Sequence, residues 1–225
     1  MLIQLKDIHK SYGSRDNASF QPVLQGLDFT VEKNDTVAIL GPSGSGKSTL
    51  LNIVGSLDHP DSGSYFFGER DITGYSEREL DRFRNSEVGF IFQFHHLLPQ
   101  CSLLENVLIP TLANNSGSKE VRAYAEELLQ RIGLWEHRGK LPGQLSGGEC
   151  QRAAVVRSMI NRPSLILADE PTGALDGSNV EIIASLMQQL NKEDQVTVVM
   201  VTHSRELAST MDRIFELKEG KLHQQ

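Results

Sequence analysis

Short apolar runs alternate with longer segments of helical periodicity along most of this chain. Runs of the length and composition typical of buried strands occupy residues 2–5, 27–31, 37–40, 65–67, 88–92, 164–168, 195–201 and 214–217. Helices are expected after residue 47, over 76–85, 119–132, 150–160 and 180–190, and from 205 onward. Strands that alternate with helices in this way predict an α/β fold with a mostly parallel sheet covered on both faces.

The pattern changes between residues 94 and 157, where apolar residues recur at helical spacing and Pro99 and Pro110 interrupt them. The clearest amphipathic helix, residues 119–132, lies in this stretch. We therefore expect a single domain, 1–225. A nucleotide-binding core would comprise 1–93 and 158–225, and a helical subdomain about 94–157.

A glycine-rich stretch follows the strand predicted at 37–40 and leads into a helix. It matches the phosphate-loop template G-x-x-x-x-G-K-[ST], and its residues are Gly41, Pro42, Ser43, Gly44, Ser45, Gly46, Lys47, Ser48 and Thr49. Glycines let backbone N–H groups turn toward phosphate oxygens, and the helix adds the positive end of its dipole. Lys47 would reach the β- and γ-phosphates, and Ser48 would ligate Mg²⁺. The alternative is a flexible glycine turn before a core helix.

Polar side chains follow three further predicted strands, namely Gln93, the pair Asp169 and Glu170, and His203. Ligands of parallel sheets bind at the carboxyl ends of the strands. Asp169 is a candidate Mg²⁺ ligand, and Glu170 is a candidate general base that would activate water. Gln93 would sense the γ-phosphate or the metal, and His203 would contact the γ-phosphate. Each residue alone could instead be a polar cap at a strand end.

A second glycine-bearing helix start lies at Leu145-Ser146-Gly147-Gly148-Glu149. Ser146 is a typical N-cap, so this helix start could bind an anion. Since the chain has one phosphate loop, this site could serve a nucleotide held mainly by another copy of the chain. The alternative is an ordinary capped helix.

Bulk properties narrow the class of protein. The 225 residues suffice for one large α/β domain, and the net charge of −7 argues against nucleic acid as a partner. The sequence holds no apolar stretch near the ~18 residues that a membrane-spanning helix needs. Tyr12 precedes the phosphate loop and could stack on a base, or could simply be a packed or exposed tyrosine.

Taken together, these motifs resemble the ATP-binding-cassette (ABC) family over essentially the whole chain. The matching residues are 41–48, Gln93, 145–149, Leu-Ile-Leu-Ala-Asp-Glu at 165–170, Ala-Leu-Asp at 174–176, and His203. The resemblance implies a head-to-tail homodimer that hydrolyses two ATP molecules, each held between one phosphate loop and the opposing signature motif, Ser146, Gly147 and Gly148. It also implies that Tyr12 stacks on adenine, that Lys47 and His203 join Glu170 in catalysis, and that Asp176 couples the two sites.

The stretch Phe92-Gln93-Phe94-His95-His96-Leu97-Leu98-Pro99 resembles ATPases of the lipoprotein-release and macrolide-exporter group. This resemblance implies a peripheral subunit at the cytoplasmic face of the inner membrane. It would bind integral-membrane permease subunits with large extracytoplasmic domains, and the apolar residues after Gln93 would receive a helix of that partner. Lipoprotein release is the expected function. Macrolide or peptide export and a cell-division role are alternatives, as are a soluble cassette acting on DNA or ribosomes and a non-hydrolysing regulatory binder.

Overall fold

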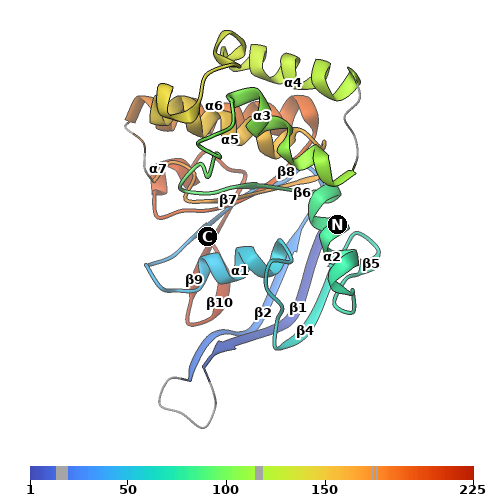
Figure 1. Cartoon of the computed structure of the whole chain (residues 1–225). Helices are drawn as coiled ribbons and strands as arrows, with labels where there is room; N and C mark the ends of the chain where they lie inside the picture. The colour runs from blue at the N-terminus through green and yellow to red at the C-terminus, as the bar shows by residue number, and fades with distance from the viewer. Residues whose placement is uncertain (14–19, 115–118, 174, 176) are drawn as a thin grey trace.

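The strands form two sheets in the computed structural model, which describes residues 1–13, 20–114, 119–173, 175 and 177–225 (Figure 1). The smaller, antiparallel sheet has the order β2-β1-β4-β5 and consists of β1 (Ile3–Tyr12), β2 (Gln21–Val31), β4 (Ser62–Phe67) and β5 (Arg70–Asp71). The larger sheet has the order β10-β9-β3-β8-β7-β6 and consists of β3 (Thr36–Leu40), β6 (Val88–Ile91), β7 (Leu165–Asp169), β8 (Thr197–Val201), β9 (Arg213–Lys218) and β10 (Lys221–Gln224). All its pairs are parallel except β10 with β9.

Helices cover both faces of the larger sheet. They are α1 (Lys47–Val54), α2 (Glu77–Glu87), α3 (Leu103–Leu108), α4 (Lys119–Arg131), α5 (Gly147–Met159), α6 (Gly177–Asp194) and α7 (Arg205–Ala208). In Figure 1, α1 lies between the two sheets, and α3 to α6 lie beyond the opposite face of the larger sheet. Within the described part of the chain, no helix has both the length and the apolar character needed to cross a bilayer.

The central strands β3, β7 and β8 are apolar at all but one end position each, because each face packs against a different core. On β3, Val37 and Ile39 pack with α1 and the smaller sheet, whereas Ala38 and Leu40 pack with the helices beyond. The same alternation divides β7 and β8 between the two cores. This is the pattern of a parallel strand buried on both sides, and it confirms the predicted α/β fold.

The structure extends several predicted elements. The helix expected from residue 150 begins at Gly147, since Ser146 and Glu149 form a capping box there. Strands β1 and β2 run on until Tyr12 pairs with Gln21, well beyond the apolar residues that signalled them. Strand β10 was not predicted. It joins β9 through Glu219 and Gly220, whose φ angles of 52° and 75° suit the tight turn of a hairpin.

The parallel order determines where the site lies. Strands β3, β6, β7 and β8 all run in one direction, so their carboxyl ends meet at one edge of the larger sheet. The phosphate loop, Gln93, the acidic pair and His203 each follow one of these ends. Segments far apart in the sequence are thereby brought to one edge.

Candidate functional site: a nucleotide site at the sheet edge

The phosphate loop requires glycine at two points. Gly46 has a φ of 101°, in the left-handed region, and a Cβ added there would lie 2.6 Å from Val23 Cγ1. A Cβ added at Gly41 would lie 2.9 Å from the carbonyl oxygen of Leu217. Larger residues would therefore push the loop away from the strands beneath it.

Positive charge is concentrated where the loop enters α1. The Lys47 ammonium is largely buried and donates to the carbonyl oxygens of Gly41, at 2.8 Å, and Pro42, at 3.0 Å. Helix α1 has Gly46 as its N-cap and carries no acidic residue in its first turn. The ammonium and the N–H groups at this end of the helix suit an anion such as a phosphate.

Asp169 ends strand β7 beside the phosphate loop. Burial raises the pKa of this carboxyl group above its ordinary value of 3.8, while a hydrogen bond with Ser48 opposes the shift. Repulsion by Glu170 also raises the pKa, and attraction by Lys47 lowers it. A carboxylate that burial destabilises is stabilised by a cation, so a positively charged ligand at this position would favour the ionised form.

Glu170 turns sharply away from β7. Its φ of 46° lies in the left-handed region, and its N–H donates to the carbonyl oxygen of Val201 at 3.0 Å. The carboxylate oxygen Oε2 accepts from the His203 N–H at 3.2 Å and lies 2.9 Å from His203 Nδ1. The ends of β7 and β8 thus hold Glu170 and His203 together.

These groups share one cavity of about 460 Å³. Its lining is Val23, Ser43, Gly44, Gly46, Lys47, Ser48, Thr49, Gln93, Asp169, Glu170 and His203. The structure therefore brings together the phosphate loop and all four polar positions predicted at strand ends. Gly41, Pro42 and Ser45 complete the loop beside it. The arrangement combines an anion-binding loop, a candidate metal ligand and a candidate base.

Tyr12 is next to this cavity but is not one of the residues that line it. Its hydroxyl donates to Asp58 Oδ2 at 2.9 Å and lies 3.4 Å from Thr49 Oγ1, so the end of β1 is linked to α1. The side chain is 44% exposed. Its stacking on adenine stays a prediction.

The signature residues lie outside the cavity of their own chain. Ser146 Oγ accepts from the Glu149 N–H at 3.2 Å, and Glu149 Oε2 accepts from the Ser146 N–H at 2.7 Å. Ser146 and Gly147 are exposed, whereas Gly148 is buried. A Cβ added at Gly148 would lie 2.1 Å from Asn179 Oδ1 on α6, so this glycine lets the two helices approach closely. Asp176 lies outside the described residues.

Gln151, on α5, was missed by the sequence analysis. Its side chain is 2% exposed, and Nε2 donates to the carbonyl oxygens of Phe92, at 2.9 Å, and Pro171, at 2.8 Å. These carbonyls flank Gln93 and Glu170, so one amide holds the segments after β6 and β7 together. The available signal was a polar residue within a helix whose neighbours are mostly apolar.

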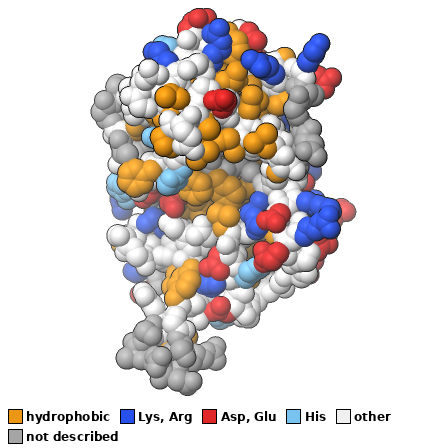
Figure 2. Space-filling model, viewed as in Figure 1, with side chains coloured by type: hydrophobic (Ala, Val, Ile, Leu, Met, Phe, Trp, Pro, Cys, Tyr) orange, Lys and Arg blue, Asp and Glu red, His pale blue; other side chains and the backbone are white. Residues whose placement is uncertain are grey.

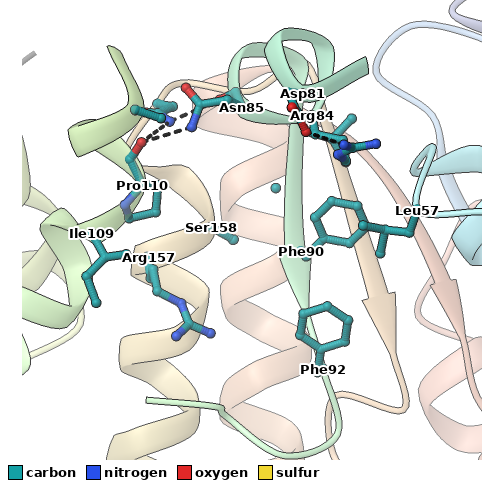
Figure 3. Close-up of a pocket in the computed structure, with 14 residues that line it drawn as sticks. Leu57, Asp81, Arg84, Asn85, Phe90, Phe92, Ile109, Pro110, Arg157 and Ser158 are labelled. Atoms are coloured by element: carbon teal, nitrogen blue, oxygen red, sulfur yellow. Dashed lines mark hydrogen bonds and ion pairs between the residues drawn. The ribbon is translucent and has the colours of Figure 1, made fainter. Parts of the chain in front are cut away.

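A second cavity, of about 640 Å³, lies beside the apolar stretch that follows Gln93. Figure 3 shows Phe90, Phe92, Ile109, Pro110 and Arg157 around it. Hydrophobic side chains gather in a hollow in the middle of the face drawn in Figure 2. Three large apolar side chains of this region are exposed, namely Phe94 (63%), Leu98 (42%) and Leu112 (73%). Exposure of this kind is typical of a protein contact surface.

The phosphate loop, the polar strand ends and the separate signature motif are also found together in a family of known proteins. The family model for ABC transporters matches residues 24–173. The chain belongs to the ABC transporter ATPase family. Its membership confirms the predicted fold class and the predicted ATPase activity, while the roles of single residues stay predictions.

Relatives within the ABC family match along the full chain. The lipoprotein-releasing system ATP-binding proteins LolD of Desulfotalea psychrophila and Idiomarina loihiensis are 46% and 43% identical, over 100% of this chain and 99% and 97% of their own. A solved structure, the dimeric ATP-binding cassette MJ0796 in a post-hydrolysis state bound to ADP and Pi, is 37% identical. It superposes with a TM-score of 0.90 over 100% of this chain and 98% of its own.

Proposed function

We propose that the chain is the ATP-hydrolysing subunit of a transporter that releases lipoproteins from a membrane. The observation that carries this proposal is the full-length similarity, at 46% and 43% identity, to proteins named as ATP-binding subunits of lipoprotein-releasing systems. The stretch from Phe92 to Pro99 and its exposed apolar side chains agree with a subunit that works against a membrane partner.

The working form in this proposal is a head-to-tail homodimer. In one chain, Ser146, Gly147 and Gly148 lie outside the cavity that the phosphate loop lines, so a second copy is needed to bring a signature motif to each phosphate loop. Solved structures of a cassette 37% and 38% identical to this chain are described as dimeric. Two ATP molecules would then lie between the copies.

Different residues in and beside the cavity would bind different parts of ATP and its metal ion. The loop amides and Lys47 bind the phosphates, and the Tyr12 ring, partly exposed, would stack on adenine. Ser48, Gln93 and Asp169 offer hydroxyl, amide and carboxylate oxygens, a donor set that fits Mg²⁺. When bound there, Mg²⁺ would neutralise charge on the phosphate oxygens.

Hydrolysis requires a group that takes a proton from water. Glu170 would take this role, which is supported by its position in the cavity lining and by the contacts of its carboxylate with His203 at the end of β8. His203 would also contact the γ-phosphate. A well-placed general base contributes about 10²–10⁴-fold to a rate, so Glu170 carries a large share of the expected catalysis.

Transport would follow from closure and reopening of the dimer. The membrane partner, with its large extracytoplasmic domains, would place a cytoplasmic helix against the apolar residues after Gln93, next to the cavity that Phe90 and Phe92 line (Figure 3). The chain would therefore sit at the cytoplasmic face of the inner membrane. ATP binding would close the two copies, and hydrolysis would open them again, which moves the attached partner.

Purification of the chain from its native membranes in mild detergent tests this proposal. We expect a permease with a large extracytoplasmic domain to co-purify, together with lipoprotein. Co-purification of a drug-exporter permease without lipoprotein would overturn the assignment of lipoprotein as the cargo. Recovery with DNA or ribosomes, and with no membrane protein, would overturn the transport function while leaving the ATPase assignment intact.

A further inference from the structure

Residues 94–102, here called the docking segment, belong to the connection from β6 to α3 and form no helix or strand of their own. The backbone groups of such a segment need other partners, because buried N–H and C=O groups left without hydrogen bonds cost free energy. Phe94 and Leu98, two of the exposed apolar side chains, belong to it. The question is therefore what fixes the shape in which these side chains are displayed.

Arg157 of α5 binds one end of the docking segment. Its Nη2 donates to the His95 carbonyl oxygen at 2.7 Å, and its Nη1 donates to that of His96 at 2.8 Å. His96 has a φ of 46°, and this left-handed turn presents the two successive carbonyls to the guanidinium group. Burial lowers the pKa of Arg157. In Figure 3 the side chain extends from α5 into the cavity.

Asn106 of α3 binds the other end. The side chain is fully buried, and its Oδ1 accepts from the Leu98 N–H at 2.6 Å. Its Nδ2 lies within hydrogen-bond distance of the carbonyl oxygens of Leu98, Cys101 and Ser102. Two side chains from two helices thus supply partners that regular secondary structure would otherwise provide.

Helix α5, which carries Arg157, also contacts other parts of the site. The helix begins at the signature motif, where Ser146 is its N-cap, and Gln151 one turn later bonds the Phe92 carbonyl next to Gln93. Arg157 lies nearly three turns beyond the start of the helix. A single helix therefore connects the signature motif, the segment that carries Gln93 and the docking segment.

We propose that Arg157 is a positioning residue: its two hydrogen bonds lock the docking segment to α5, the helix that begins at the signature motif. A displacement of the exposed apolar side chains by a partner is then transmitted to Ser146–Gly148 through the rigid helix α5 and not through a flexible loop. The functional meaning of the lock rests on the proposed docking of a membrane partner, but the lock itself is a property of the isolated chain.

Arginine suits this position because its planar fork offers two N–H groups in fixed geometry, and two successive carbonyls accept them. Lysine carries the same charge on a single nitrogen at the end of a flexible stem, so its N–H groups are not held in the fixed planar fork with which arginine meets both carbonyls. Arg157→Lys therefore tests the fork separately from the charge, and Arg157→Gln removes both.

Hydrogen exchange in the isolated chain tests the lock. In Arg157→Gln we expect the amides of Leu97 and Leu98 to exchange about tenfold faster than in the wild type, with Arg157→Lys in between. Arg131→Gln is the matched control, since this α4 arginine bonds Asp194 at 2.6 Å and does not touch the docking segment. Faster exchange at 97–98 in the control as well would show general loosening and overturn the proposal.

Nucleotide kinetics supply a readout that a merely structural role would not move. We expect Arg157→Gln to lower kcat several-fold through displacement of the Gln93 segment, with ADP affinity within about twofold of wild type, because the phosphate loop is untouched. If the amides of residues 97–98 exchange at the wild-type rate in Arg157→Gln, the proposed role of Arg157 is wrong, whichever cargo the transporter carries. Co-purification of the wild-type chain with a permease is judged separately, so failure of the transport assignment remains distinguishable.

Discussion

At the scale of single residues, Glu170 is the position on which the proposed chemistry depends most. Its backbone has a φ of 46°, and its carboxylate is held by the backbone and ring of His203. The energy spent on this uncommon conformation is consistent with a functional role. Glu170 is identifiable from the sequence, because an apolar strand that ends in two acidic residues is a strong signal, but its contact with His203 depends on tertiary structure and is not.

Replacement of Glu170 by glutamine tests the role of the base. The variant keeps the shape of the side chain but cannot take a proton, so we expect turnover to fall by about 10²–10⁴-fold. ATP binding should persist and should trap a closed dimer, which analytical ultracentrifugation would detect. Glu206→Gln, an exposed acid on α7, is the control and should turn over normally. Turnover near the wild-type rate in Glu170→Gln would remove the residue from this role.

Asp169 gives a prediction about pH. Burial raises its pKa in the folded chain above 3.8, so the folded state holds the proton more tightly than the unfolded state does. Stability of the nucleotide-free chain therefore decreases as the pH rises from about 4 through the folded pKa. Asp169→Asn removes the buried charge and should raise the free energy of unfolding at pH 7 by on the order of 1 kcal/mol.

Urea denaturation of Asp169→Asn and wild type between pH 4 and pH 8 measures this difference. The gain should shrink toward pH 4, because the charge whose burial is unfavourable is progressively removed from the folded wild type as its carboxyl group takes up a proton. A gain of equal size at every pH would show that the substitution acts through packing and not through charge.

At the scale of elements, the sequence predicted most of the architecture because its central strands are apolar on both faces. Val37–Leu40 and Leu165–Ala168 could hardly be anything but buried strands. Strand β10 is polar and gave no such signal. It forms because a two-residue turn brings it back alongside β9. Gln151, Arg157 and Asn106 were missed since a polar residue on a helix ordinarily indicates solvent, and only tertiary contacts show otherwise.

Gln151 provides a test of α5 as a structural connector. Gln151→Ala leaves the carbonyls of Phe92 and Pro171 without this donor and should lower the free energy of unfolding by about 1–3 kcal/mol in chemical denaturation. Gln130→Ala, an exposed glutamine of α4 that contacts Glu126, is the control and should change it by less than about 0.5 kcal/mol. Equal losses in both variants would contradict the connector role.

At the scale of the whole molecule, each proposed catalytic site needs residues from two chains, because one chain supplies only the phosphate-loop half of it. The phosphate loop and the acidic pair lie in one cavity, and the signature motif lies elsewhere. The sequence indicated two anion-binding helix starts, but distance between them within a chain is a tertiary property that periodicity cannot supply. A second copy resolves the mismatch.

Mixing two defective variants tests this composite arrangement. Lys47→Ala removes the phosphate-loop ammonium, and Ser146→Arg blocks the signature, so each variant alone should be nearly inactive. A hybrid dimer pairs the intact loop of one chain with the intact signature of the other, and turnover should rise well above that of either parent. Phosphate release measures the recovery. A mixture no more active than its parents would argue for sites contained within single chains.

The exposed display of Phe94, Leu98 and Leu112 has an evolutionary consequence. Phe94 and Leu98 project from the docking segment, whose shape is set by Arg157 and Asn106, and Leu112 projects from the 3-10 helix Ile109–Asn114. Because all three point outward, exchanging them alters little of the packed interior. A lineage can therefore change which partner the surface suits by substituting a few outward residues while the hydrolytic machinery stays as it is. Paralogues with new partners are expected to diverge here first and at the sheet edge last.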